Sequence, residues 1–274
     1  MNRRKLYLIA MLFATLGFVS CEEKEVLTCP TGVENGYEWV DLGLPSGLKW
    51  ANHNIGATKP EESGLLFAWG ETSSKEMFDW EGYKYCDVEF AIANDSIEEI
   101  SNPLWCGINK YHVDDGVYSN SSIPGFGEKD KSKQIYWYKQ IKSGGDEFKF
   151  TGDSITILDP EDDAAIANMG ENWRMPTVEE MEELRVECTW EWTERNGVKG
   201  YKVKGKNGNF IFLPAIGFKM GGEMVDAGKG GYYWSKSLSG KTKFASSFYF
   251  CSDRRSASTE ADRCNGRPIR AVCP

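Results

Sequence analysis

The stretch TWEWTERNGVKGYKVKGKNGNFIFL, residues 189–213, decides the fold class. Apolar residues alternate with polar ones along it, which is the pattern of half-buried strands. Asn196-Gly197 and Asn207-Gly208 interrupt the alternation, and Asn-Gly favours a tight hairpin because both residues tolerate positive φ. The stretch therefore predicts antiparallel pairing of Thr189–Trp192 with Tyr201–Val203, and of that strand with Phe210–Leu213.

A first helix is predicted upstream of these strands. Asp159 is its expected N-cap, Pro160 stands at the first helical position, and Gly170 marks its end. Three acids follow the proline, and a metal site is one interpretation of them. We favour the other, in which they lie on a solvated first turn and interact with the helix dipole. These acids are Glu161, Asp162 and Asp163.

A second helix is predicted to begin at Thr177. The Thr177 hydroxyl and the Glu180 carboxylate have the spacing of a capping box, in which each side chain accepts from the backbone of the other. Met181, Leu184 and Cys188 then recur on one helical face, so we expect that face to pack against the core.

Strands are predicted on both sides of the helices. Tyr37–Trp50 contains two apolar runs around a Gly-Leu-Pro-Ser-Gly turn, and Ser63–Gly70 is a further short apolar run. Gly221-Gly222 and Gly230-Gly231 are turn signals. The composition between Cys86 and Phe148 is mixed, which is typical of a long insertion. Helices between two sets of strands indicate an α+β fold, and the late strands are Tyr232–Trp234, Phe244–Phe250 and Arg267–Val272.

The N-terminus has the pattern of an export signal. A basic start is followed by an apolar run too short to span a bilayer, so residues 1–20 are interpreted as a signal peptide. Phe18-Val19-Ser20-Cys21 resembles the lipobox of bacterial lipoproteins, which predicts lipidation of Cys21. The alternative is an ordinary secreted protein in which Cys21 is a core or disulfide thiol. Residues 21–36 are then the lipidated cysteine and a flexible tether.

The charge excludes one class of partner. Removing Arg3, Arg4 and Lys5 leaves 29 basic against 41 acidic residues, a net charge of −12. Binding to a phosphate backbone needs a concentrated basic face, so we expect no nucleic-acid partner.

Cysteine spacing favours structural disulfides over metal ligands. The chain has eight cysteines, and removing Cys21 leaves an odd number. There is no C-x-x-C pair, and the two histidines, His53 and His112, lie far apart, so no zinc site is predicted. We expect one to three disulfides and at least one free thiol. The pairing stays open, and the candidates are Cys251, Cys264, Cys188 and Cys273.

Several sequence blocks together resemble the Fibrobacter succinogenes major paralogous domain family. The resemblance implies a cell-surface lipoprotein, anchored in the outer membrane and facing outward, with a C-type-lectin-like fold. It implies one domain over residues 37–274, with insertions at about 87–104 and 113–150, and two helices packed on short antiparallel sheets. The blocks are WVDLGLPSGLKWA (39–51), NIGA (54–57), FAWGET (67–72), LDPEDDAA (158–165), WRMPT (173–177), GNFIFLPA (208–215), GYYWS (231–235) and GRPIR (266–270).

The function that this resemblance implies is non-catalytic binding of a glycan or a protein. Lectin-like folds carry ligands on long loops, which here correspond to Lys219–Gly231 and Ser252–Asp262, although a plain solvated loop is the alternative for the second. Stacking on a sugar ring is one interpretation of Trp69 and Trp234, but in such an aromatic-rich chain we expect both to be buried. The candidate ligand-binding residues are Asp253, Arg254, Arg255, Ser256, Ser258, Glu260 and Asp262.

Two other functions stay open. One is an enzyme of the formylglycine-generating or glycan-processing type, and the other is a structural component of a surface assembly. In the first, a copper-binding cysteine pair is expected, but the spacing of Cys264 and Cys273 suits a disulfide or two separate partners better. We expect no catalytic residue, metal or other cofactor.

Overall fold

The computed structural model describes residues 30–86, 108, 110–111, 117–119, 137–142, 145–150 and 153–274, with the backbone alone for the three ranges from 117 to 150. The predicted signal peptide, Cys21 and the insertion at 87–104 lie outside the described residues. No helix in the described ranges is long and apolar enough to cross a membrane.

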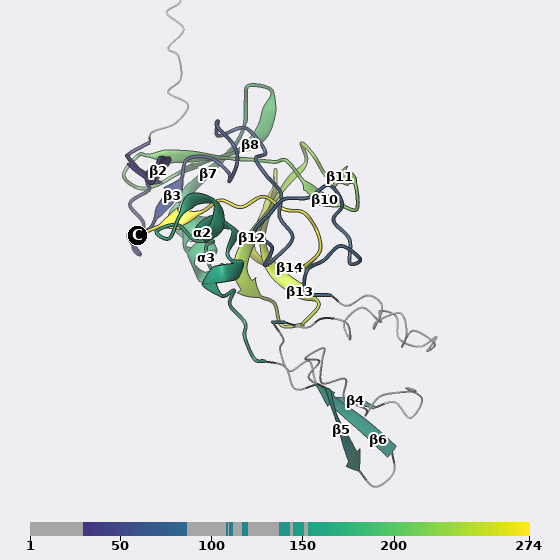
Figure 1. Cartoon of the computed structure of the whole chain (residues 1–274). Coiled ribbons are helices and arrows are strands. Elements are labelled where there is room, and N and C mark those ends of the chain that lie inside the picture. Colours follow the sequence, from purple (N-terminus) through teal and green to yellow (C-terminus); the bar gives the residue numbers. More distant parts are fainter. Residues whose placement is uncertain are drawn as a thin grey trace, which may run out of the picture.

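The described chain is a mixed fold of two short α-helices and several small antiparallel sheets, which confirms the α+β prediction (Figure 1). One sheet has the order β1-β2-β3-β15, a second β7-β8-β9 and a third β12-β13-β14, beside a β10-β11 hairpin and a β4-β6-β5 sheet. The bounds are β1 Gly32–Glu34, β2 Tyr37–Asp41, β3 Lys49–Ala51, β4 Val117–Ser119, β5 Trp137–Lys142, β6 Gly145–Phe150, β7 Thr189–Arg195, β8 Val198–Lys204, β9 Phe210–Pro214, β10 Phe218–Met220, β11 Glu223–Val225, β12 Gly230–Leu238, β13 Phe244–Cys251, β14 Arg254–Asp262 and β15 Val272–Cys273.

The hairpins predicted in residues 189–213 are confirmed. Trp192 pairs with Tyr201, and Tyr201 pairs with Leu213. Asn196 and Gly197 both have positive φ, 47° and 81°, as a tight hairpin turn requires.

The Gly230-Gly231 turn was predicted wrongly, because both residues lie inside β12. A Cβ on Gly231 would lie only 2.1 Å from Cζ of Phe250 on the neighbouring strand. The glycine therefore permits the close approach of an aromatic ring and not a reversal of the chain.

The first helix differs from its prediction. The chain forms a 3-10 helix, η2, over Pro160–Asp162 and then α2 over Ala164–Met169. The N-cap of α2 is Asp163, whereas Asp159 makes no side-chain cap hydrogen bond. Asp162 and Asp163 are buried, so the prediction of a solvated acidic turn was wrong for both.

The second helix, α3 over Val178–Glu187, has the predicted capping box between Thr177 and Glu180. Its Met181 and Leu184 are buried, each 2 % exposed. The face of α3 packs against the β12-β13-β14 sheet.

Both ends of the described chain meet in one sheet. The predicted first hairpin is confirmed as β2 and β3, and β15 pairs with β3. Gly32–Glu34 forms β1 against β2, so the flexible tether predicted to reach residue 36 ends before residue 32.

Two predicted strands are shorter than expected. Ser63–Gly70 forms only an isolated bridge, between Phe67 and Arg267, and within Arg267–Val272 only Val272 is in a strand. Pro268 has no amide proton for a strand ladder, and the flanking arginine side chains bind other parts of the chain.

Three arginines of the C-terminal segment lie in the core. Arg263, Arg267 and Arg270 are at most 5 % exposed. Arg263 binds three backbone carbonyls and the Tyr83 hydroxyl, and Arg267 lies 4.8 Å from the Trp234 ring centroid. Loss of hydration lowers the pKa of both Arg267 and Arg270 to about 10. Carbonyls and aromatic rings thus replace water around these cations.

The four candidate cysteines, whose pairing the sequence left open, form no disulfide with one another. Cys188, Cys251, Cys264 and Cys273 carry free thiols. Cys251 lies beside the β13-β14 turn, whereas Cys264 follows the opposite end of that hairpin, where Phe244 pairs with Asp262. Seven residues (251 minus 244) at about 3.3 Å each separate the two ends, and a disulfide needs Cα atoms within about 7 Å. Burial raises the pKa of Cys264 to about 12 and of Cys273 to about 11, so neither is an activated thiolate.

Candidate ligand-binding groove

The segment predicted as a ligand-binding loop, Ser252–Asp262, is mainly the strand β14. A bulge lies opposite Phe248, where Ser247 pairs with Thr259 but Tyr249 pairs with Ser256. Ala257 and Ala261 are buried, whereas Ser258 and Glu260 are exposed. The loop prediction was wrong because alanines, which bury easily, supply the inner face of a strand whose other residues are polar.

Two of the predicted binding residues, Ser258 and Glu260, line an open groove of about 390 Å³. The end of β12, β13 and β14 form one side, and the first turn of α3 and the segment before η2 complete it. The lining residues are Thr156, Ile157, Val178, Glu179, Ser237, Leu238, Ser239, Gly240, Ser246, Ser258 and Glu260.

The groove is lined by hydroxyls and two carboxylates. Ser246 donates to the carbonyl of Leu238, and the Ser237 hydroxyl accepts from the amide of Val178, so both help to form the wall. Glu179 and Glu260 are exposed, and Glu260 has only a surface ion pair with Lys241, at 3.2 Å. Such exposed pairs are weak, so both carboxylates can bind a ligand.

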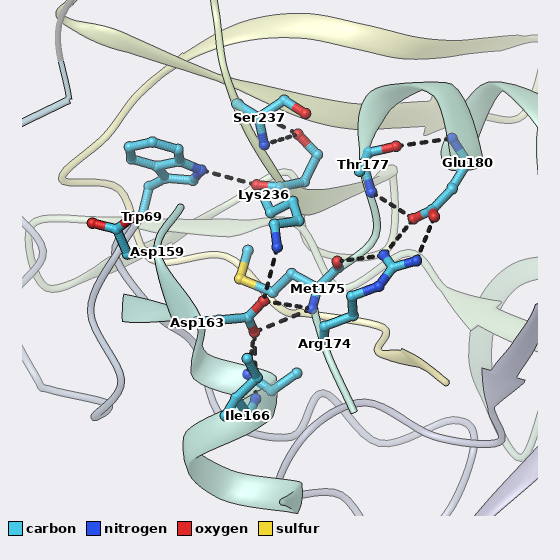
Figure 2. Close-up of polar contacts among 12 residues, drawn as sticks. Trp69, Asp159, Asp163, Ile166, Arg174, Met175, Thr177, Glu180, Lys236 and Ser237 are labelled. Carbon is cyan, nitrogen blue, oxygen red and sulfur yellow. Dashed lines mark hydrogen bonds and ion pairs between the residues drawn. The ribbon is translucent and has the colours of Figure 1, made fainter. Parts of the chain in front are cut away.

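A buried network fixes the groove wall from behind (Figure 2). The Asp163 carboxylate accepts from the amides of Ala165 at 2.9 Å and of Met175 at 3.0 Å, and it lies 3.9 Å from Nζ of Lys236. Burial raises the pKa of Asp163. The network joins α2, the segment before α3 and β12, which carries Ser237.

The end of β12 is further held by neighbouring segments. The Trp69 indole N–H donates to the carbonyl of Ser235, and the amide of Lys236 donates to the carbonyl of Pro176. The amide of Leu238 donates to the carbonyl of Thr156, on the other side of the groove. The groove therefore lies on a rigid frame.

Carboxylates of η2 form a second cluster, next to the core. Oxygens of Asp159, Glu161 and Asp162 lie within 4.8 Å of one another. Lysines already bind this cluster: Nζ of Lys110 lies 2.6 Å and Nζ of Lys84 2.8 Å from Asp162. Burial alone would raise the pKa of Asp162, but hydrogen bonds from the two lysines and from Tyr111 outweigh it and hold that pKa well below its usual range.

Replacement of Asp162 by asparagine should make stability less sensitive to acid. A carboxyl with a lowered folded-state pKa stabilises the fold fully above its unfolded pKa of about 3.9, and that contribution is lost progressively as the pH falls from this value towards the folded-state pKa. The free energy of unfolding of the wild type should therefore exceed that of D162N most at pH 7, and the difference should be smaller at pH 3. Urea unfolding at pH 7, 5, 4 and 3 measures this, and a difference independent of pH would contradict it.

The remaining predicted binding residues lie outside the groove. Asp253, Arg254 and Arg255 are at the turn end of β14, and Asp262 forms a 3.0 Å ion pair with Lys243. The Ser256 hydroxyl donates to the carbonyl of Ser258. The other predicted loop, Lys219–Gly231, contains the β10-β11 hairpin. Trp69 and Trp234 are completely buried, as predicted.

Sequence reasoning missed Glu179, Ser237 and Ser246. The capping box places Glu179 in the first turn of α3, which is a usable signal for an exposed acid. No local pattern indicates that this turn lies beside residues 237 and 246.

Comparisons of this chain with protein-family models, with curated proteins and with solved structures give no match.

Proposed function

We propose that this chain is a non-catalytic, surface-anchored binding protein whose groove receives a glycan or a protein segment. The main observation in support is the lining of the groove. It contains Ser258 and Glu260, which were selected from the sequence as binding residues, together with Glu179 and four further hydroxyl side chains. Hydroxyls and carboxylates on a rigid frame suit a polar ligand.

No lining residue of the groove is a histidine, a cysteine or a lysine. Nucleophilic catalysis usually combines a nucleophile with a nearby base of these types, and the serines here have no such neighbour in the lining. This argues against nucleophilic catalysis by these serines.

The fold and location belong to the same proposal. The sequence blocks support a C-type-lectin-like domain of the Fibrobacter succinogenes major paralogous type, and the first 21 residues support export and a lipid anchor at Cys21 in the outer membrane. Mass spectrometry of the N-terminal peptide from membranes tests the anchor, and an unmodified Cys21 would overturn it.

Glycan and protein arrays probed with residues 22–274 test the binding function. A ligand from either array should lose affinity by at least about tenfold with Ser258→Arg, because the larger side chain fills the groove. Ser63→Arg is the matched control, since Ser63 is exposed and lies outside the groove.

Two results would count against the proposal. Absence of any hit on both arrays would reject binding as the function. Equal affinities of S258R and the wild type for an identified ligand would retain binding but move the site away from the groove.

A further inference from the structure

Arg255 lies at the opposite end of β14 from the groove and is held over aromatic rings. Its guanidinium carbon is 5.6 Å from the Trp190 ring centroid and 5.2 Å from that of Tyr201. Nη1 of Arg255 donates to the Tyr201 hydroxyl at 3.1 Å. That hydroxyl lies 3.0 Å from the carbonyl of Cys251, to which it donates in turn. An exposed arginine is thereby fixed in one orientation.

The charge of Arg255 has no ion-pair partner among the described residues. Asp253, two positions away, accepts from the thiol of Cys251 at 3.0 Å. On the adjacent hairpin, Glu191 pairs with Lys202, while Trp190 and Trp192 lie on the other face of that strand. The remaining N–H groups of Arg255 are therefore available to an anion from outside.

Aromatic surface lies beside these free donors. Trp190 and Trp192 are half-buried, and one face of Trp190 stacks on Phe248 with ring centroids 5.5 Å apart. Trp192 meets Tyr201 edge to face at 5.0 Å. Tyr201 is buried and Trp190 is packed on the core, so the rings that hold Arg255 are fixed, while Trp190 and Trp192 each keep part of their surface exposed.

We propose that Arg255, Trp190 and Trp192 form a second binding site, for a sugar residue that carries a carboxylate. The planar guanidinium matches a carboxylate with two parallel N–H···O bonds. Phe248 and the Arg255 guanidinium cover the Trp190 ring, so the apolar face of the sugar ring packs on Trp192. Both contacts are made on a preorganised surface, so little side-chain entropy is lost on binding. This site is separate from the serine-lined groove and does not depend on it.

The test uses an oligomer of galacturonic acid and the full-chain protein. The methyl ester of the same oligomer keeps the ring but removes the charge, so it should bind at least about tenfold more weakly. Arg255→Gln should reduce affinity for the acid by at least about tenfold, and Arg255→Lys should have an intermediate affinity because it keeps the charge but lacks the planar fork. Lys204→Gln is the control, since it removes an equal charge from the opposite face of the β7-β8 hairpin.

Any of three results with the sugar ligands would overturn this proposal: no binding of the acid at millimolar concentration, equal binding of acid and ester, or equal losses in R255Q and K204Q. An oligoglutamate peptide tests the competing source of carboxylates. If it binds more tightly than the oligosaccharide and needs Arg255 equally, the site is one for acidic peptides and the sugar assignment fails. Arg255 is exposed, so R255Q should unfold at the same urea concentration as the wild type.

Discussion

Replacement of Arg270 by methionine should destabilise the protein by at least about 4 kcal/mol. Arg270 is 1 % exposed and donates to four acceptors: Oδ1 of Asn54 and the carbonyls of Ala51, Asn52 and Phe212. Methionine fills much of the volume but leaves these acceptors buried without donors, each at a cost of about 1–3 kcal/mol.

Such a loss approaches the whole stability of a typical domain, about 5–15 kcal/mol. Thermal unfolding should therefore occur at least about 10 °C lower in R270M. Arg270→Lys keeps the charge and part of the donor set, so its unfolding temperature should lie between those of R270M and the wild type. If R270M does not fold, the unfolding temperature of R270K can still be measured. Arg185→Met, which breaks only a surface pair with Glu182, should change stability by less than about 1 kcal/mol. An unfolding temperature of R270M within about 3 °C of the wild type would contradict the role of Arg270.

Replacement of Asp163 by alanine should cost about 3–5 kcal/mol. The change removes the acceptor for the amides of Ala165 and Met175 and leaves Lys236, whose side chain is 14 % exposed, without its carboxylate. Asp163→Asn should cost less, because its remaining oxygen still accepts from the backbone.

A control and a double-mutant cycle separate the contributions to this effect. Asp159→Ala should cost less than about 1 kcal/mol, because Asp159 makes only a part-exposed ion pair with Lys110 and caps no helix. If D159A lowers the free energy of unfolding as much as D163A does, Asp163 is not the N-cap of α2. Lys236→Met should cost less in the D163A background than in the wild type, and equal costs would show that the two charges do not interact.

The parts of the fold that were predicted correctly depend on residues close in sequence. The Asn196-Gly197 turn fixes the register of its own hairpin, and Thr177 and Glu180 lie three positions apart. In the first helix, by contrast, Asp159 and Asp163 both suit an N-cap, and the choice depends on the amide of Met175, which approaches Asp163 from another segment.

The candidate site could be predicted only in part for the same reason. Ser258 and Glu260 stand in Ser252–Asp262, the segment that the resemblance to lectin-like folds indicated as a ligand-binding loop, and were selected on that basis. They lie apart from Arg255 because all three residues are on one strand, β14. The sequence pattern did not indicate this strand, because a bulge opposite Phe248 disrupts the alternation of buried and exposed residues along it. Ser237 and Glu179 meet through tertiary packing, for which the sequence holds no local signal.

The pairing of β15 with β3 has a consequence for the time course of folding. Val272 pairs with Trp50, a separation of 222 residues (272 minus 50), and Cys273 pairs with Lys49. Contacts between such distant positions form slowly, and this sheet cannot be completed before residue 273 has been synthesised. Until then β3 is paired with β2 alone and lacks β15 on its other side, and Asn54 lacks the Arg270 guanidinium. A nascent chain of this topology should therefore remain incompletely folded and accessible to chaperones throughout its synthesis. Translocation across a membrane requires such an incompletely folded state.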